Sequence, residues 1–146
     1  MTPCYLRIVR DPLPATAREA AVQVQGPQDA LSVVGPLLRA EPSEVMLAVL
    51  LTAKHAVIGV HTVARGGIDH VSCEPREVFR AALLANAAAV ILAHNHPSGD
   101  ATPSNRDIDV TRRIAAAGRL LGIPLLDHLV VGDGSWTSLA EHCVAP

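Results

Sequence analysis

The chain has 146 residues and a net charge of −2, with 49% hydrophobic and 18% charged residues. This length and composition are typical of one compact globular domain, and they exclude a disordered or fibrous chain. A nucleic-acid binder usually has a basic surface and several stacking aromatic side chains. The near-neutral charge and the few aromatics, Tyr5, Phe79 and Trp136, do not favour that class.

The sequence predicts neither secretion nor a membrane span. The first residues lack the apolar centre of a signal peptide, and no uninterrupted apolar run approaches the length of about 18 residues that a span needs. Cys4, Cys73 and Cys143 are odd in number and scattered, which indicates reduced thiols and no disulfide framework. We therefore expect a cytoplasmic protein.

Residues 1–27 are expected to be an N-terminal strand and turn-rich segment, with the strand at Tyr5 to Arg10. Residues 28–146 are expected to form the main domain, so that the whole chain is one globular unit. This domain begins with a predicted helix from about Gln28 to Ala40, which we expect Gly35-Pro36 to interrupt.

Two paired strands are expected next. The run from Ser43 to Leu51 becomes continuously apolar, as in a strand buried on both faces. Lys54-His55 predicts a turn, and Ala56 to Ala64 predicts the partner strand. A helix is then expected from Pro75 to about Asn86, because proline is favoured at the first helical position.

A strand from Ala88 to Ala93 leads into the polar stretch His94 to Asp107. A further helix is expected from Ser104 to a stop at Gly122, followed by a buried strand from Ile123 to Gly132. The order helix, strand, strand, helix, strand, helix, strand predicts an α/β fold with a mixed sheet flanked by helices.

The polar stretch contains the residues of a predicted metal site. His94 and His96 project to the same side of an extended segment, because side chains alternate along a strand. Ser104 and Asp107 fit the capping pattern at a helix start, and helical periodicity places Asp107 on the same inward stripe as Val110, Ile114 and Leu121. An inward carboxylate needs a partner. Two imidazoles and one carboxylate leave a fourth zinc position open, which is typical of a catalytic site.

A helix cap alone also explains Ser104 and Asp107, because an acidic residue in the first turn is favourable there. The combination of two histidines, a Pro/Gly loop and an inward acid favours the metal site over this alternative. The outer side of the same helix is expected to be a solvated basic face in which Asp109 pairs with Arg113; its arginines are Arg106, Arg112, Arg113 and Arg119.

At this spacing, His94-x-His96-Pro97 with Ser104 and Asp107 resembles the JAMM motif of the MPN/JAB family of metal-dependent proteases and deubiquitinases. The longer pattern, HNHPSGD followed by LLDHLVVG, resembles the RadC branch. The resemblance covers residues from about Glu44 to Gly132.

This resemblance implies a cytidine-deaminase-like sandwich with one Zn²⁺ per chain, held by His94, His96 and Asp107. It implies hydrolysis of peptide or isopeptide bonds by a water molecule that the zinc activates. Glu44 matches the family's glutamate by position and would act as general base and then acid. Glu41 is a competitor, although it lies further from the strand.

Three further residues have open roles. Ser104 is expected to cap its helix and to donate a hydrogen bond to the oxyanion formed during hydrolysis. Asp127 and His128 interrupt an apolar strand, and buried polar side chains need partners. They are either hydrogen-bonded residues of the core or groups that orient a metal ligand.

Two other functions compete with hydrolysis. One is a DNA-repair or DNA-processing accessory role, to which the RadC name is historically tied; longer relatives carry an N-terminal helix-hairpin-helix domain, for which the residues before Glu44 are too few and too rich in proline. The other is a non-catalytic MPN scaffold, against which the complete ligand set speaks. The expected partner is a peptide or protein substrate. No membrane is expected, nucleic acid is a possible partner that the charge does not support, and an edge strand is compatible with a homodimer.

Overall fold

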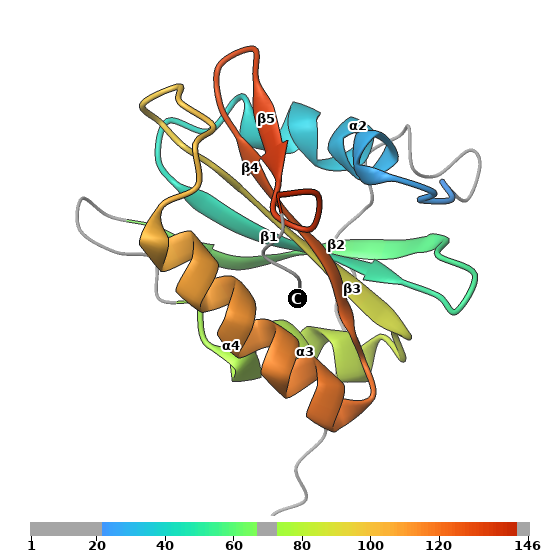
Figure 1. Ribbon diagram of the computed structural model, residues 1–146. Helices are drawn as coiled ribbons and strands as arrows, with labels where there is room; N and C mark the ends of the chain where they lie inside the picture. The colour runs from blue at the N-terminus through green and yellow to red at the C-terminus, as the bar shows by residue number, and fades with distance from the viewer. Residues whose placement is uncertain (1–21, 67–72, 143–146) are drawn as a thin grey trace, which may run out of the picture.

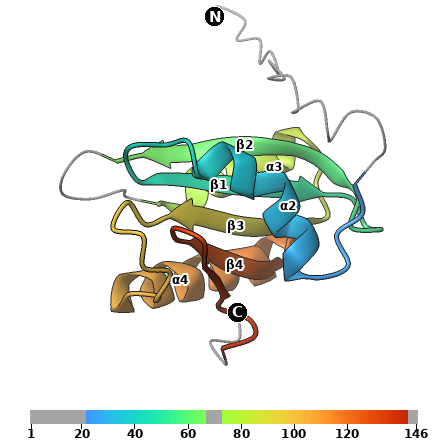
Figure 2. The same cartoon turned by 90° about the horizontal axis from the view of Figure 1, so that it is seen from above.

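The computed structural model describes residues 22–66 and 73–142. Within these ranges the helices are α2 (Pro27–Leu38), α3 (Pro75–Leu84) and α4 (Asn105–Leu121). The strands are β1 (Val45–Leu51), β2 (Val57–Arg65), β3 (Ala89–Asn95), β4 (Leu125–Val131) and β5 (Trp136–Ser138). They form one sheet in the order β2-β1-β3-β4-β5. Helix α2 covers one face and α3 with α4 covers the other (Figures 1 and 2).

The sheet is mixed, because β1 pairs antiparallel with β2 and β3, whereas β3 pairs parallel with β4. Every residue of β1 and β3 is buried, since helices cover both faces. Alternate residues of β1 face opposite helix layers: Val45, Leu47, Val49 and Leu51 pack on the α2 side, and Met46, Ala48 and Leu50 pack on the side of α3 and α4. The predicted fold class, an α/β mixed sheet flanked by helices, is confirmed.

Helix α2 runs through Gly35 and ends at Leu38, so the predicted interruption at Gly35-Pro36 is wrong. Proline removes one backbone donor and crowds the carbonyl four residues earlier, which disrupts a helix mainly in its interior. Pro36 is exposed and lies in the last turn, while Val34 and Leu38 keep the other side of the helix packed on the sheet.

Strand β3 continues to Asn95, two residues beyond its predicted end at Ala93. The parallel ladder explains the difference, because His94 and Asn95 pair with β4, and the backbone N–H of His96 donates to Val131 at 2.9 Å. The side chains of His94 and Asn95 are therefore fixed at the end of this strand, and His94 lies beside the start of α4.

Helix α4 starts and ends as predicted. Ser104 forms a capping box with Asp107, and Gly122 adopts a left-handed conformation with φ of 71°. The prediction that Leu121 lies on the inward stripe is wrong, because its side chain is 45% exposed. Leu121 is the last helical residue, where the chain has already begun to turn towards β4.

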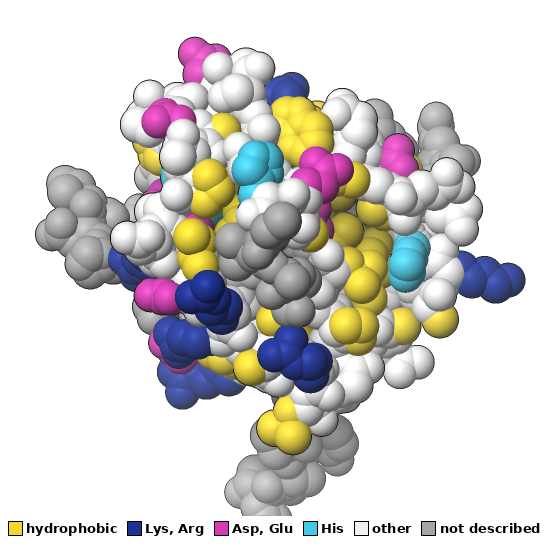
Figure 3. Space-filling model, in the orientation of Figure 1, with side chains coloured by type: hydrophobic (Ala, Val, Ile, Leu, Met, Phe, Trp, Pro, Cys, Tyr) yellow, Lys and Arg dark blue, Asp and Glu magenta, His cyan; other side chains and the backbone are white. Residues whose placement is uncertain are grey.

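Dark blue side chains gather over α4 in Figure 3, and the basic residues of this helix are all arginines. Arg113 does not take the predicted partner Asp109; its guanidinium pairs with Glu74 at 2.8 Å, which ties α4 to the segment before α3. Exposed ion pairs of this kind add little to stability.

Strand β5 was not predicted, because it has three residues and, within the described residues, pairs with the end of β4 alone. At the other end of the described chain, Gln23 forms a bridge with Ala56 beside the start of β2. The predicted strand at Tyr5 to Arg10 lies outside the described residues. No helix in residues 22–66 and 73–142 is both long and apolar enough to cross a membrane.

Candidate metal centre

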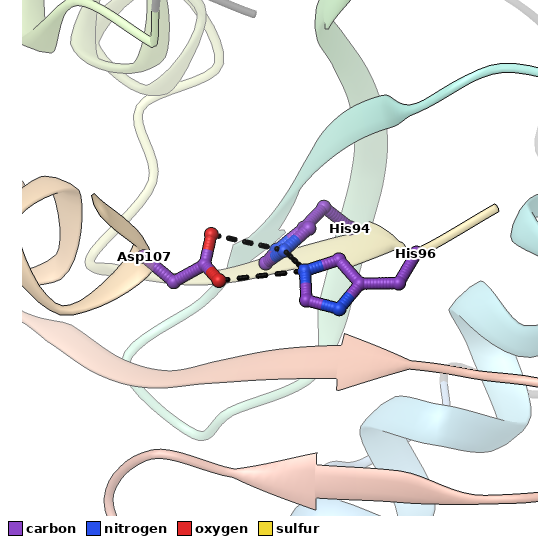
Figure 4. A group of neighbouring side chains, drawn as sticks. All are labelled: His94, His96 and Asp107. Atoms are coloured by element: carbon purple, nitrogen blue, oxygen red, sulfur yellow. Dashed lines mark hydrogen bonds and ion pairs between the residues drawn. The ribbon is translucent and has the colours of Figure 1, made fainter. Parts of the chain in front are cut away.

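Three side chains converge at the end of β3, as Figure 4 shows. His94 comes from the strand itself, His96 from the residue after it, and Asp107 from the first turn of α4. The two Nε2 atoms are 3.0 Å apart. The Asp107 carboxylate lies 3.2 Å from Nε2 of His94 and 3.4 Å from Nε2 of His96. The structure therefore brings together the three predicted ligands.

The spacing of these atoms fits a single metal ion. Zinc binds imidazole nitrogen and carboxylate oxygen at about 2.0–2.2 Å, so neighbouring donor atoms of a tetrahedral centre are about 3.3 Å apart. The two Nε2 atoms are 3.0 Å apart, and they lie 3.2 Å and 3.4 Å from different oxygens of Asp107, Oδ1 for His94 and Oδ2 for His96. One ligand atom from each residue is available, and His94, His96 and Asp107 form a group that could hold a metal ion.

The loop after β3 orients the His96 ring. Its Nδ1 lies 2.8 Å from the backbone carbonyl of Asp100. A carbonyl only accepts hydrogen bonds, so Nδ1 carries the proton and Nε2 of the neutral ring presents its lone pair to the site. The contact thus prepares His96 as an Nε2 ligand.

Asp107 acts in the helix cap and in the cluster at the same time. Its Oδ2 accepts hydrogen bonds from the backbone N–H of Ser104 at 2.7 Å and from the Ser104 hydroxyl at 2.6 Å, while Oδ1 is the oxygen nearer to His94. Burial on its own raises the pKa of this carboxyl, but the close His94 and His96 imidazoles and the hydrogen bond from Ser104 outweigh burial and hold the pKa well below its usual range. The carboxylate is therefore ionised and held in place.

Ser104 is exposed at the N-terminus of α4, and its hydroxyl proton is donated to Asp107. Its capping role is thus visible in the structure. Donation to an oxyanion stays a prediction, and it requires the hydroxyl proton to turn away from Asp107 during the reaction.

Asp127 and His128 lie on opposite faces of β4. Nε2 of His128 is 2.9 Å from Nδ1 of His94, so this residue contacts a predicted ligand directly. The Asp127 carboxylate accepts hydrogen bonds from the Ser138 hydroxyl and from the backbone N–H groups of His128 and Ala140. These contacts favour His128 and not Asp127 as a residue that orients a metal ligand.

Glu44 immediately precedes β1 and is half-buried. By strand alternation it shares a side with Met46, whose partner across the ladder is His94. The charge of Glu44 is also among the groups that raise the pKa of His96. The competing Glu41 is engaged elsewhere, because its carboxylate forms an ion pair with Arg65 at 2.7 Å.

Sequence reasoning missed two polar residues around the cluster. Asn95 accepts a hydrogen bond from the backbone N–H of Val45 at 2.7 Å and donates to the backbone carbonyl of Ser43 at 3.0 Å, so it fastens the segment that carries Glu44 to β3. Thr111 in α4 contacts His128 at 2.7 Å. The signal for Asn95 is a polar residue inside a buried strand, which requires partners. Thr111 gives no comparable signal, because threonine is common in helices.

Metal affinity is expected to depend on pH through His96. The hydrogen bond with Asp107 raises the pKa of His96 above its ordinary value of 6.5, against the opposing effect of burial. A proton on Nε2 competes with the metal ion, so affinity is low below this pKa and rises by up to about tenfold per pH unit as pH approaches it from below. Asp107 stays ionised throughout this range and contributes no slope. Zinc titrations between about pH 5 and pH 8 measure the effect, and a flat affinity across that window would contradict it.

The loop after His96 packs against Gly132 at the end of β4. A Cβ atom at Gly132 would lie 2.3 Å from the Gly99 carbonyl oxygen and 2.9 Å from the Ala101 backbone nitrogen. Because these atoms belong to backbone, they give way only if the whole loop moves. The same loop holds the Asp100 carbonyl against His96.

Gly132→Ala is therefore expected to destabilise the fold by about 1–3 kcal/mol, as other overpacked sites do, and to weaken zinc binding by displacing the partner of His96. Denaturant unfolding and zinc titration measure the two effects. Gly59→Ala in β2 is the control, because nothing lies within 4 Å of its Cβ position. Equal behaviour of the two variants would show that the close approach at Gly132 is unimportant.

Comparison with known proteins gives an independent result. The RadC-like JAB domain matches residues 24–144 of the chain. A UPF0758 protein of Salinibacter ruber is 46% identical over 127 residues, which cover 87% of this chain and 54% of that protein. A UPF0758 protein of Alkaliphilus oremlandii is 40% identical over 120 residues, covering 82% and 52%. A UPF0758 protein of Moorella thermoacetica is 46% identical over 118 residues, covering 81% and 52%.

The chain spans about half the length of these relatives. The predicted resemblance to the RadC branch is confirmed, and it extends over most of the described fold and all three residues of the cluster. The chain belongs to the RadC-like JAB domain family.

Proposed function

We propose that the protein is a zinc-dependent hydrolase of the JAMM type that cleaves peptide or isopeptide bonds. The observation that supports this most strongly is the convergence of two imidazole Nε2 atoms and one ionised carboxylate into a group that could hold a metal ion. The JAB domain family includes metalloproteases, which agrees with this chemistry.

His94, His96 and Asp107 are the residues that would hold the ion. Zinc bound by three protein ligands supplies a Lewis acid that lowers the pKa of water and polarises a carbonyl group. The Asp100 carbonyl behind His96 and the Ser104 cap behind Asp107 would hold two of these side chains in place for the ion.

The chain itself supplies the proton transfers. Glu44 would take a proton from the attacking water and deliver it to the nitrogen of the departing amine, acting first as base and then as acid. The Ser104 hydroxyl, after release from Asp107, would donate a hydrogen bond to the oxyanion. Asn95 keeps Glu44 at the correct end of β3 through its bonds to residues 43 and 45.

The test uses the full chain loaded with zinc, incubated with a mixture of linear peptides and lysine-branched isopeptides in ¹⁸O-labelled water. Mass spectrometry is expected to show new amino termini or free lysine side chains, together with one ¹⁸O atom in each new carboxylate, as hydrolysis requires. Removal of zinc by a chelator should abolish cleavage, and re-addition should restore it. Intact peptides and isopeptides with the zinc-loaded protein would contradict the proposal.

A further inference from the structure

A continuous series of hydrogen bonds joins β3 and α4, the two elements that carry the proposed metal ligands. Nδ1 of His94 in β3 lies 2.9 Å from Nε2 of His128 in β4. Nδ1 of His128 lies 2.7 Å from the Thr111 hydroxyl in α4. The Thr111 hydroxyl in turn donates to the backbone carbonyl of Asp107 at 2.6 Å. All four residues are buried, so the protein and not solvent determines where each proton lies.

The direction of these bonds follows from the Asp107 carbonyl. A carbonyl cannot donate, so the single proton of the Thr111 hydroxyl points at it. Thr111 can then only accept from Nδ1 of His128, which must carry a proton. A neutral His128 ring protonated on Nδ1 has a bare Nε2, and this nitrogen accepts the Nδ1 proton of His94.

His128 is neutral in this arrangement because its ring is fully buried and its hydrogen-bond partners within the described residues are another imidazole and a hydroxyl group. The groups that face it are the His94 ring from β3 and the Thr111 hydroxyl from α4, and no carboxylate among the described residues forms a hydrogen bond with it. An isolated buried charge is costly. A charged His128 would also place protons on both of its nitrogens and reverse the bond to His94.

We propose that Thr111 and His128 are positioning residues that fix His94 as the Nδ1–H tautomer, so that its Nε2 lone pair points at the metal site. The same bonds connect the strand ligand His94 to the helix ligand Asp107, because Thr111 is bonded to the backbone of Asp107 one turn away. The arrangement determines which ring nitrogen of His94 carries the proton. It also fixes the distance between His94 and Asp107. The inference rests on the proposed zinc site, and not on hydrolysis.

The first measurement is the long-range ¹H–¹⁵N NMR spectrum of the histidine rings in the metal-free protein, which distinguishes protonated from bare ring nitrogens. His94 and His128 are both expected to be protonated on Nδ1 and bare on Nε2. An Nε2–H tautomer for either ring overturns the inference. This result does not depend on zinc affinity or on activity, so it stays informative if the proposed hydrolysis fails.

The second measurement is zinc affinity, determined by competition with a chromophoric chelator. Thr111→Val removes the hydroxyl with little change of shape and is expected to weaken zinc binding about 10- to 100-fold, as is typical when a hydrogen-bond partner of a ligand is lost. Thr62→Val, the same change at an exposed position of β2, is the control and should leave affinity unchanged.

His128 provides the rescue experiment. His128→Gln retains an acceptor for His94 and a donor for Thr111, so it should keep most of the zinc affinity, whereas His128→Leu should lose about 10- to 100-fold. A purely structural role would not separate these two variants, provided that both give folded NMR spectra. Equal affinities of the glutamine and leucine variants, or wild-type affinity in Thr111→Val, overturn the inference.

Discussion

Replacing Glu44 by glutamine is expected to lower kcat for peptide or isopeptide hydrolysis by about 10²- to 10⁴-fold, the usual contribution of a general base. This corresponds to roughly 3–5 kcal/mol of transition-state stabilisation. The amide has nearly the same shape but cannot accept a proton from water. Glu44 is not one of the three clustered ligands, so zinc content should stay at the wild-type level. Steady-state kinetics and elemental analysis of the same preparations measure both quantities.

Glu41→Gln is the matched control, because Glu41 belongs to the same segment and its carboxylate is already paired with Arg65. It should leave kcat within a few-fold of the wild type. The assignment of Glu44 is wrong if the Glu41 variant loses activity and the Glu44 variant keeps it. If both variants keep full activity, no carboxylate of this segment acts as the base.

The central fold could be predicted from the sequence because its strands have two covered faces. The run that ends at Leu51 is apolar on both sides of a strand, so it predicts a central strand that is covered on both faces. The helix that begins after Ser104 could also be predicted, because a capping box marks its start and a glycine marks its end. These signals depend on neighbouring residues in the sequence and not on contacts with distant parts of the chain.

The grouping of His94, His96 and Asp107 could also be predicted, since alternation along β3 and periodicity along α4 each place a side chain on a known side. What the sequence could not give is which neighbours surround them. Thr111 and His128 are 17 residues apart, and only the parallel pairing of β3 with β4 brings His128 to His94. Strand register depends on the whole sheet, so no local pattern predicts these contacts.

The same limit explains the errors. Gly35-Pro36 looks like a helix break locally, but packing of α2 on the sheet outweighs the loss of one backbone bond. β5 has too few residues for a pattern, and its existence depends on the edge that β4 offers. The predicted partner of Arg113 was its neighbour on the helix, whereas the fold brings Glu74 closer.

Asp107→Asn is expected to abolish specific zinc binding, with affinity lower by at least about 100-fold, because an anionic ligand is replaced by a neutral amide at an otherwise unchanged site. The substitution tests the metal site against the helix cap, since asparagine can still accept the backbone N–H of Ser104. A cap alone predicts a loss of about 1 kcal/mol or less and no response to zinc. Competition with a chromophoric chelator measures the affinity.

Thermal unfolding gives a second readout that needs no substrate. Free zinc at about 100 times its Kd stabilises a protein that binds it only when folded by about 2.7 kcal/mol, so the wild type should melt at a higher temperature when zinc is added. The Asp107→Asn melting temperature should not respond. Asp109→Asn, an exposed carboxylate two residues further along the same helix, should respond as the wild type does. Identical zinc responses in all three proteins would place the ion elsewhere, and with it the site on which the proposed hydrolysis depends.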